Sequence, residues 1–165
     1  MAIDLLRPDL KFLFCGYNPS LRSGATGYHY AHPGNRFWRV LHASGITKRL
    51  YRPEEDEQLL GLGIGFTNLV SGPTRRADEL TREEIQAGAE ELREKLERFE
   101  PRVVAYTGIG VYRWFRATSK VSWGLQEDSA VPSVTDVVVP SPSGLNRMRF
   151  EELVEHYRAL APFLS

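Results

Sequence analysis

Four short apolar runs along the chain have the length and composition of buried strands. They lie at residues 10–15, 66–70, 102–107 and 134–139. Gly16 stops the first run and Pro140 stops the last, and both residue types commonly end regular structure. We therefore predict four strands at these positions.

Capped or amphipathic segments between these runs predict helices. They cover residues 35–44, 53–60, 81–99, 108–115 and a last segment from about residue 149. Thr81 and Glu84 have the spacing of a capping box at the start of the longest segment. The apolar positions that follow recur at steps of four, three, four and three, as on one buried helix face: Ile85, Ala89, Leu92, Leu96 and Phe99.

The alternation of strands and helices predicts the fold class. We expect an α/β three-layer sandwich, in which a central, mostly parallel four-stranded sheet carries helices on both faces, as a single domain over residues 1–165. Functional sites in such folds lie beyond the carboxyl ends of the strands. The loops after the first and last strands, residues 16–34 and 140–148, are therefore the first candidates. Glycines and prolines in residues 16–34 predict a long loop without a regular element.

The composition excludes several classes of protein. Of the 165 residues, 42% are hydrophobic and 25% are charged, which is ordinary for a globular domain. No apolar run approaches the length of a membrane span, and the N-terminus has no secretory pattern. The single cysteine, Cys15, permits neither an internal disulfide nor a multi-cysteine metal site, and fits a reducing compartment.

The charges balance overall but are unevenly distributed. There are 21 basic and 21 acidic residues, which gives a net charge of zero. Residues 1–52 hold 8 basic and 2 acidic side chains, whereas residues 53–100 hold 6 and 13. We interpret the acidic middle as solvated helix faces. The neutral total argues against strong non-specific binding to DNA, so any nucleic-acid site is expected to be compact.

Two candidate binding features follow the first predicted strand. Asn18 offers a carbonyl acceptor and an amide donor, which can hold a water and a substrate group together, although Asn before Pro is also common in turns. Tyr30 is either a stacking platform for a base or a loop aromatic that covers the core. His29 and His32 lack the further ligands that a metal site needs.

Two more candidates lie in later loops. Leu145, in the loop after the last strand, is either an apolar wedge that enters a base stack or a leucine tucked into the core. Asp78 follows the second strand and could orient or activate water beside Asn18, or be an exposed acid near a helix start. The preceding Arg75 and Arg76 are either phosphate contacts or solvated side chains.

Together these motifs resemble the mismatch-specific uracil-DNA glycosylase family, which includes thymine-DNA glycosylases. The matching segments occur in order along nearly the whole chain: residues 16–20 (GYNPS), 26–27 (TG), 31–33 (AHP), 35–38 (NRFW), 67–70 (TNLV), 73–74 (PT) and 142–145 (PSGL), with Arg147. The sequence departs from the family at five positions: Tyr17 for Ile, Ser20 for Gly, Tyr30 for the frequent Phe, Ser141 for Asn, and Asn146 for a small residue.

The resemblance implies a uracil-DNA glycosylase-like fold and a DNA repair function. A member of this family flips uracil out of double-stranded DNA, preferentially from G·U pairs, and hydrolyses its N-glycosidic bond, leaving an abasic site. It implies a monomer without a metal or organic cofactor and without a membrane partner. The compact chain fits a bacterial cytoplasmic enzyme that works at the nucleoid.

The resemblance also implies a role for individual residues. Asn18 would position the attacking water, with Asp78 as its possible assistant from the residue-level argument above. The base would be bound by Gly16, Tyr17, Ser23 and the ring of Tyr30. The vacated stack and the opposite guanine would be contacted by the wedge loop: Ser143, Gly144, Leu145, Asn146 and Arg147.

Three alternative functions stay open at this point. The first is a glycosylase with a broader range that includes single-stranded uracil. The second is a non-catalytic module that binds DNA lesions. The third is a domain that binds small nucleotides, for which a wedge at Leu145 would have no purpose.

Overall fold

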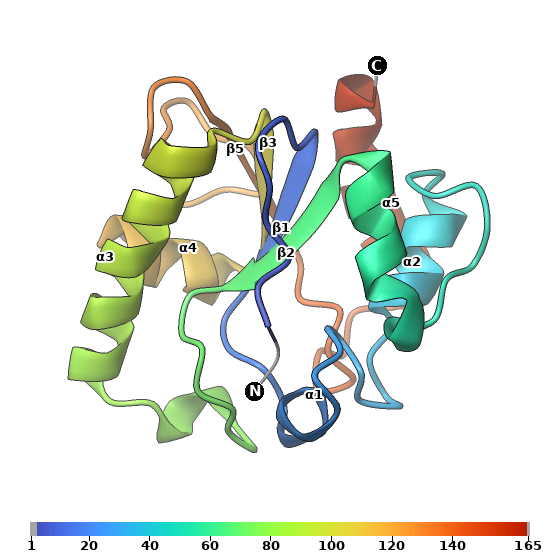
Figure 1. Ribbon diagram of the computed structural model, residues 1–165, viewed down its shortest axis with the longest axis horizontal. Coiled ribbons are helices and arrows are strands. Elements are labelled where there is room, and N and C mark those ends of the chain that lie inside the picture. The colour runs from blue at the N-terminus through green and yellow to red at the C-terminus, as the bar shows by residue number, and fades with distance from the viewer. Residues whose placement is uncertain (1–2, 165) are drawn as a thin grey trace.

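A single twisted sheet forms the centre of the molecule (Figure 1). Within residues 3–164, which the computed structural model describes, five strands are joined in the order β2-β1-β3-β5-β4. Their bounds are β1 (Phe12–Gly16), β2 (Ile64–Asn68), β3 (Val103–Thr107), β4 (Gly124–Leu125) and β5 (Thr135–Val139). The first three and β5 are mutually parallel, and only β4 is antiparallel to its neighbour. The four predicted strands are therefore confirmed, and the two-residue β4 is an addition at one edge.

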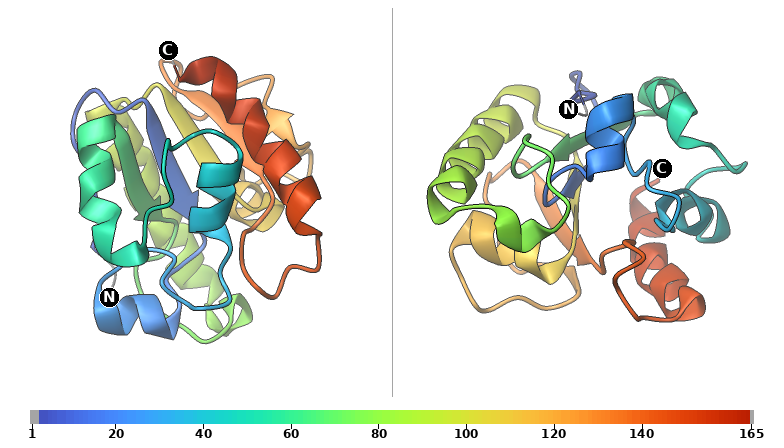
Figure 2. Two further views of the ribbon diagram at one scale, coloured as in Figure 1. Left: turned by 90° about the vertical axis from the view of Figure 1, so that its right-hand side faces the viewer. Right: turned by 90° about the horizontal axis from the view of Figure 1, so that it is seen from below.

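Helices cover both faces of this sheet, which confirms the predicted three layers (Figures 1 and 2). One face carries α2 (Phe37–Ala43), η1 (Pro53–Leu62), α5 (Phe150–Tyr157) and η3 (Arg158–Phe163). The other face carries α3 (Arg82–Phe99) and α4 (Ile109–Arg116). No helix among the described residues is both long and apolar enough to cross a membrane.

Strand β1 illustrates how alternating side chains build the two cores. Phe12 and Phe14 pack on the α2 and α5 face, whereas Leu13 and Cys15 pack on the α3 and α4 face. All four side chains are fully buried because the strand lies in the middle of a sheet covered on both sides. Burial also raises the pKa of the Cys15 thiol, which keeps the thiol protonated at neutral pH.

The predicted loop over residues 16–34 is wrong in one respect, because it contains the short helix α1 (Leu21–Thr26). Ser20 caps this helix, since its Oγ accepts a hydrogen bond from the Ser23 N–H at 3.0 Å. Gly27 ends it in the left-handed conformation, with φ of 80°. A second short segment, η2 (Ala77–Glu79), precedes α3.

The longest helix, α3, begins as predicted and packs closely on the segment after β2. Thr81 and Glu84 form the reciprocal capping box, each side chain accepting from the other residue's backbone N–H. Gly88 lies against the backbone of Leu69, and a Cβ at this position would overlap the Leu69 carbonyl. The helix can approach the sheet edge this closely only because residue 88 has no side chain.

Gly88→Ala is expected to lower the free energy of unfolding by about 2 kcal/mol, since overpacking outweighs the gain in helix propensity. Urea titration measures the change. Gly110→Ala in α4 is the matched control, because a Cβ there meets no atom within 4 Å. We expect the control to keep or slightly raise stability. Equal effects of the two substitutions would contradict the close contact.

Candidate active site

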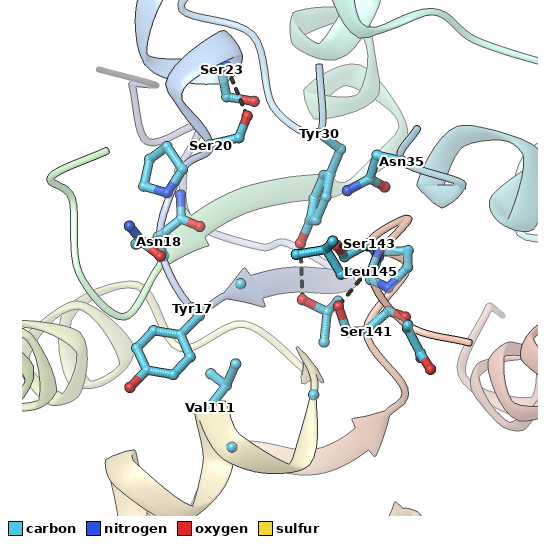
Figure 3. A pocket seen from close by; sticks show the side chains of 18 of the residues that line it. Tyr17, Asn18, Ser20, Ser23, Tyr30, Asn35, Val111, Ser141, Ser143 and Leu145 are labelled. Atoms are coloured by element: carbon cyan, nitrogen blue, oxygen red, sulfur yellow. Dashed lines mark hydrogen bonds between the residues drawn. The ribbon is translucent and has the colours of Figure 1, made fainter. Parts of the chain in front are cut away.

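The carboxyl ends of the parallel strands open onto a cavity of about 540 Å³ (Figure 3). Its wall comes from the loops after β1, β2, β3 and β5, as the fold class predicts. Most of the sequence-predicted site residues line it: Gly16, Tyr17, Asn18, Ser23, Tyr30, Ser143, Leu145 and Asn146. In Figure 3, Asn18 lies on one side of the cavity, and Tyr30 and Leu145 lie on the other.

The Asn18 amide is held in one orientation by the loop after β2. Its Nδ2 donates to the carbonyl oxygen of Gly72 at 3.0 Å and to Oγ1 of Thr74 at 2.8 Å. The Gly72 carbonyl can only accept, so the amide nitrogen must face it. Both amide hydrogens are thus engaged, and among the described residues no donor contacts Oδ1. Oδ1 is left to accept a hydrogen bond from a water or a ligand.

Gly16 forms a tightly packed floor of the cavity at the end of β1. Its register partner in β2 is Asn68. A Cβ on residue 16 would lie 2.8 Å from the Asn68 Oδ1, 3.4 Å from the Tyr30 hydroxyl and 3.6 Å from the Thr107 Oγ1. A side chain at position 16 would therefore displace polar groups that define the cavity, which explains the requirement for glycine.

The Tyr30 ring is fixed at the cavity wall. One face stacks on Phe37 at 3.9 Å between ring centroids, with an interplanar angle of 12°. The Tyr30 hydroxyl donates to Oγ1 of Thr107 at 3.2 Å, because the Thr107 hydroxyl itself donates to the Cys15 carbonyl. Burial raises the pKa of Tyr30, so the phenol remains neutral. A rigid, uncharged ring is suited to contact a planar base.

The neighbouring predicted residues have mainly structural contacts. Ser23 is buried, and its Oγ accepts from the Ala31 N–H at 3.0 Å. The Tyr17 carbonyl accepts from the Val70 N–H at 2.9 Å, which joins the loops after β1 and β2. Partial burial raises the pKa of the Tyr17 phenol, which also keeps it neutral. These contacts hold the backbone of the first loop in place.

Arg36 joins the loop after β5 to the start of α2. Its Nη1 donates to the Met148 carbonyl at 2.6 Å, and its Nη2 donates to the carbonyls of Ser143 at 3.3 Å and Asn146 at 2.9 Å. Its backbone N–H donates to the Pro142 carbonyl. One guanidinium thus satisfies three carbonyls of a loop that has no strand or helix of its own.

The same loop is also closed from within. Asn146 Nδ2 donates to the Ser141 carbonyl, and its Oδ1 accepts from the Met148 N–H. Gly144 abuts the backbone of Gly34, where a Cβ would lie 2.8 Å from the Gly34 carbonyl oxygen. Asn146 is therefore a loop-closing residue in this structure, in addition to lining the cavity.

Leu145 projects from this fixed loop with 81% of its surface exposed. Of the two alternatives that the sequence left open for Leu145, this exposure excludes the leucine tucked into the core. Arg147 is also exposed, two residues further along. Single exposed leucines are common on protein surfaces, and what distinguishes Leu145 is its place on a fixed loop that lines the cavity.

Asp78 lies outside the cavity wall, and the two histidines make local contacts with the backbone. Asp78 is not part of the cavity wall: its side chain is 71% exposed and pairs with Arg76 at 3.3 Å. The His29 Nε2 contacts the Ile3 carbonyl, and the His32 Nδ1 accepts from the Gly34 N–H. Burial lowers the pKa of His29, so it is neutral. Residues 3–164 contain no group of three His, Cys, Asp or Glu that could hold a metal.

Four contributors to the site received no site role from the sequence, although the first three lie in segments that carry the family resemblance: Arg36, Asn68, Thr74 and Thr107. Asn68 and Thr107 each end a strand, so the rule for parallel sheets could have identified them. The partnership of Thr74 with Asn18 spans 56 positions and leaves no local signal.

Comparison with known proteins identifies the class. The fold is an α/β sandwich with its cavity at the strand carboxyl ends, and the model of the uracil DNA glycosylase superfamily matches residues 3–164. The chain belongs to this superfamily. Its class is therefore that of DNA repair glycosylases, hydrolases that act on uracil-containing DNA.

A solved structure agrees with the fold. The chain is similar to the solution NMR structure of a Methanosarcina acetivorans protein that is provisionally named a uracil DNA glycosylase. The two are 22% identical with a TM-score of 0.60, over 97% of this chain and 96% of that one. At this identity the similarity concerns the fold.

Arg36→Met is expected to lower the free energy of unfolding by about 2–3 kcal/mol, because three carbonyls lose a charged donor. Urea titration measures the change. Arg149→Met is the matched control, since Arg149 is exposed and, within residues 3–164, its side chain pairs only with exposed Glu152. If both variants were equally stable, Arg36 would not be the residue that fixes the loop.

Proposed function

We propose that the protein excises uracil from duplex DNA, with a preference for G·U pairs, and leaves an abasic site. The observation that carries this proposal is the exposed Leu145 on a fixed loop beside a cavity large enough to admit a base. An apolar side chain in this place can enter a base stack as a nucleotide leaves it. A site for free nucleotides has no use for such a side chain.

The preference for G·U follows from the energy of base extrusion. A mismatched base is easier to unstack and unpair than a Watson–Crick base. Leu145 would fill the space left in the stack, while the backbone around Gly144 approaches the opposite base closely. Arg147 would contact the same region of the duplex. Selectivity then comes from the duplex as well as from the cavity.

Inside the cavity, Tyr30 and Asn68 are suited to bind the extruded uracil. The Tyr30 ring is fixed by Phe37 and offers a flat apolar contact to the base. Among the described residues, the Asn68 side chain has no hydrogen bond, and its amide can match the donor and acceptor of the uracil edge. Gly16 between them allows the base to sit against the backbone.

Asn18 would position the water that attacks the sugar. Its Oδ1 accepts a hydrogen bond from that water, while Thr74 and Gly72 fix the amide. An asparagine cannot remove a proton as a carboxylate does, so catalysis depends on positioning. Breaking the glycosidic bond builds positive charge on the sugar and negative charge on uracil, which hydrogen-bond donors at the base then stabilise.

Asn18→Ala is expected to lower the single-turnover rate of uracil excision by about 100-fold, because the water loses its acceptor. The assay uses a labelled duplex with one G·U pair, followed by alkaline cleavage of abasic sites. Binding of the same duplex should persist. An unchanged rate would remove Asn18 from the mechanism, and no excision by the wild-type protein would favour a binding module.

Asp78→Asn is measured in the same excision assay, because the sequence suggests that the Asp78 carboxylate assists Asn18. Its exposed position outside the cavity wall predicts a rate close to that of the wild type. A fall as large as that of Asn18→Ala would assign the activation of water to Asp78.

Leu145→Ala is expected to lower excision from duplex DNA about tenfold or more and to leave excision from single-stranded DNA unchanged. Only the duplex has a stack for the side chain to enter. Leu125→Ala, which removes another exposed leucine on β4, is the matched control and should change neither rate. Equal losses on both substrates would contradict the wedge.

A further inference from the structure

A second cavity adjoins the first at the turn that follows β2. It has a volume of about 430 Å³. Its lining comes from α1 and from this turn: Leu21, Pro73, Thr74, Arg75, Arg76 and Glu79. Thr74, Arg75 and Arg76 line both cavities, so the turn is a partition between them. Seen from below in Figure 2, α1 and this turn lie at the same end of the molecule.

The backbone of the turn is rigid. The Thr74 N–H donates to the Pro19 carbonyl at 3.2 Å, and the Thr74 hydroxyl donates to the Arg76 carbonyl at 2.7 Å. Asn18 Nδ2 donates to Thr74 from the first cavity. The Arg76 N–H in turn donates to the Glu79 carboxylate. The two arginines are therefore mounted on a backbone that is already ordered.

Their guanidinium groups, in contrast, are largely unengaged. Both residues are exposed, and the one ion pair seen for them within residues 3–164 joins Arg76 Nε to Asp78 Oδ1 at 3.3 Å. That pair is itself exposed and therefore weak. Guanidinium groups are the donors that most often bind phosphate, and here two of them stand on one fixed turn.

The charge balance of the chain makes this pair significant. With a net charge of zero, the protein has no general attraction to a polyanion. Affinity for the DNA backbone must come from local positive groups that are not already neutralised. Arg75 meets this condition directly beside the base cavity, and Arg76 is engaged only by its exposed pair with Asp78 among the described residues. The Arg36 guanidinium, in contrast, is already bonded to loop carbonyls.

We propose that the second cavity binds the phosphodiester next to the nucleotide whose base enters the first cavity, through Arg75 and Arg76. The proposal rests on the proposed function in that its ligand is a DNA strand. The arginine side chains contribute to strand binding and not to bond cleavage, because the contacts that hold Asn18 use Thr74 and Gly72. Truncating the side chains leaves those contacts in place.

The test measures binding to undamaged duplex DNA by fluorescence anisotropy over a series of NaCl concentrations. Replacing either arginine by alanine should reduce the slope of log K against log[salt] by about 0.9, and the double variant by about twice that. A duplex with a stable abasic-site analogue serves as a second probe and should give the same decrements. Single-turnover excision at saturating enzyme should be unchanged in Arg98→Ala, whose side chain lies outside both cavities.

Arg98→Ala is the matched control. Arg98 is exposed near the end of α3, next to the N-terminal ends of the strands and so opposite the cavities. The control should keep the wild-type slope. Equal decrements in Arg98→Ala and Arg75→Ala would overturn the proposal, since only total charge would matter.

The remaining outcomes separate this proposal from the proposed function. Normal excision with an unchanged salt slope in the double variant overturns the phosphate site alone. If the arginine variants show reduced slopes but the wild-type protein excises no uracil, the phosphate site is supported and the glycosylase is overturned. If the wild-type protein binds neither duplex, the phosphate site is overturned whatever the excision assay gives.

Discussion

The arrangement of the site depends on the single guanidinium of Arg36. The loop after β5 contains two prolines and a glycine and forms no ladder, so its carbonyls need partners from elsewhere. From the start of α2, the Arg36 guanidinium donates hydrogen bonds to three of these carbonyls. Through this contact the exposed Leu145 is held at a fixed distance from Tyr30, which the same helix supports through Phe37. The wedge loop and the cavity wall at Tyr30 therefore form one rigid unit.

The general fold could be predicted from the sequence because its determinants are local. Apolar runs of strand length and the capping box at Thr81 need no knowledge of distant residues, and they gave four strands and the main helices. Helix α1 was missed because the glycines and prolines of residues 16–34 indicated a loop, although Ser20 and Gly27 carry ordinary cap signals. Strand β4 has two residues and depends entirely on β5 for its existence.

The site was predicted only in part, for a related physical reason. Residues directly after a strand, such as Asn18, could be placed at the cavity because parallel strands share a carboxyl edge. What holds them could not be seen, since Thr74 and Arg36 act on segments more than 50 positions away. Asp78 was placed near the site by its position in a loop, yet the turn directs its side chain to solvent.

The complete burial of Cys15 has a practical consequence. It is the sole cysteine in the sequence, it lies in the interior strand β1, and its thiol is held in the unreactive protonated form. A cysteine introduced on the surface would then be the only one open to a maleimide dye. A fluorophore or spin label can be attached at a chosen point beside the cavity, with the native thiol left in place.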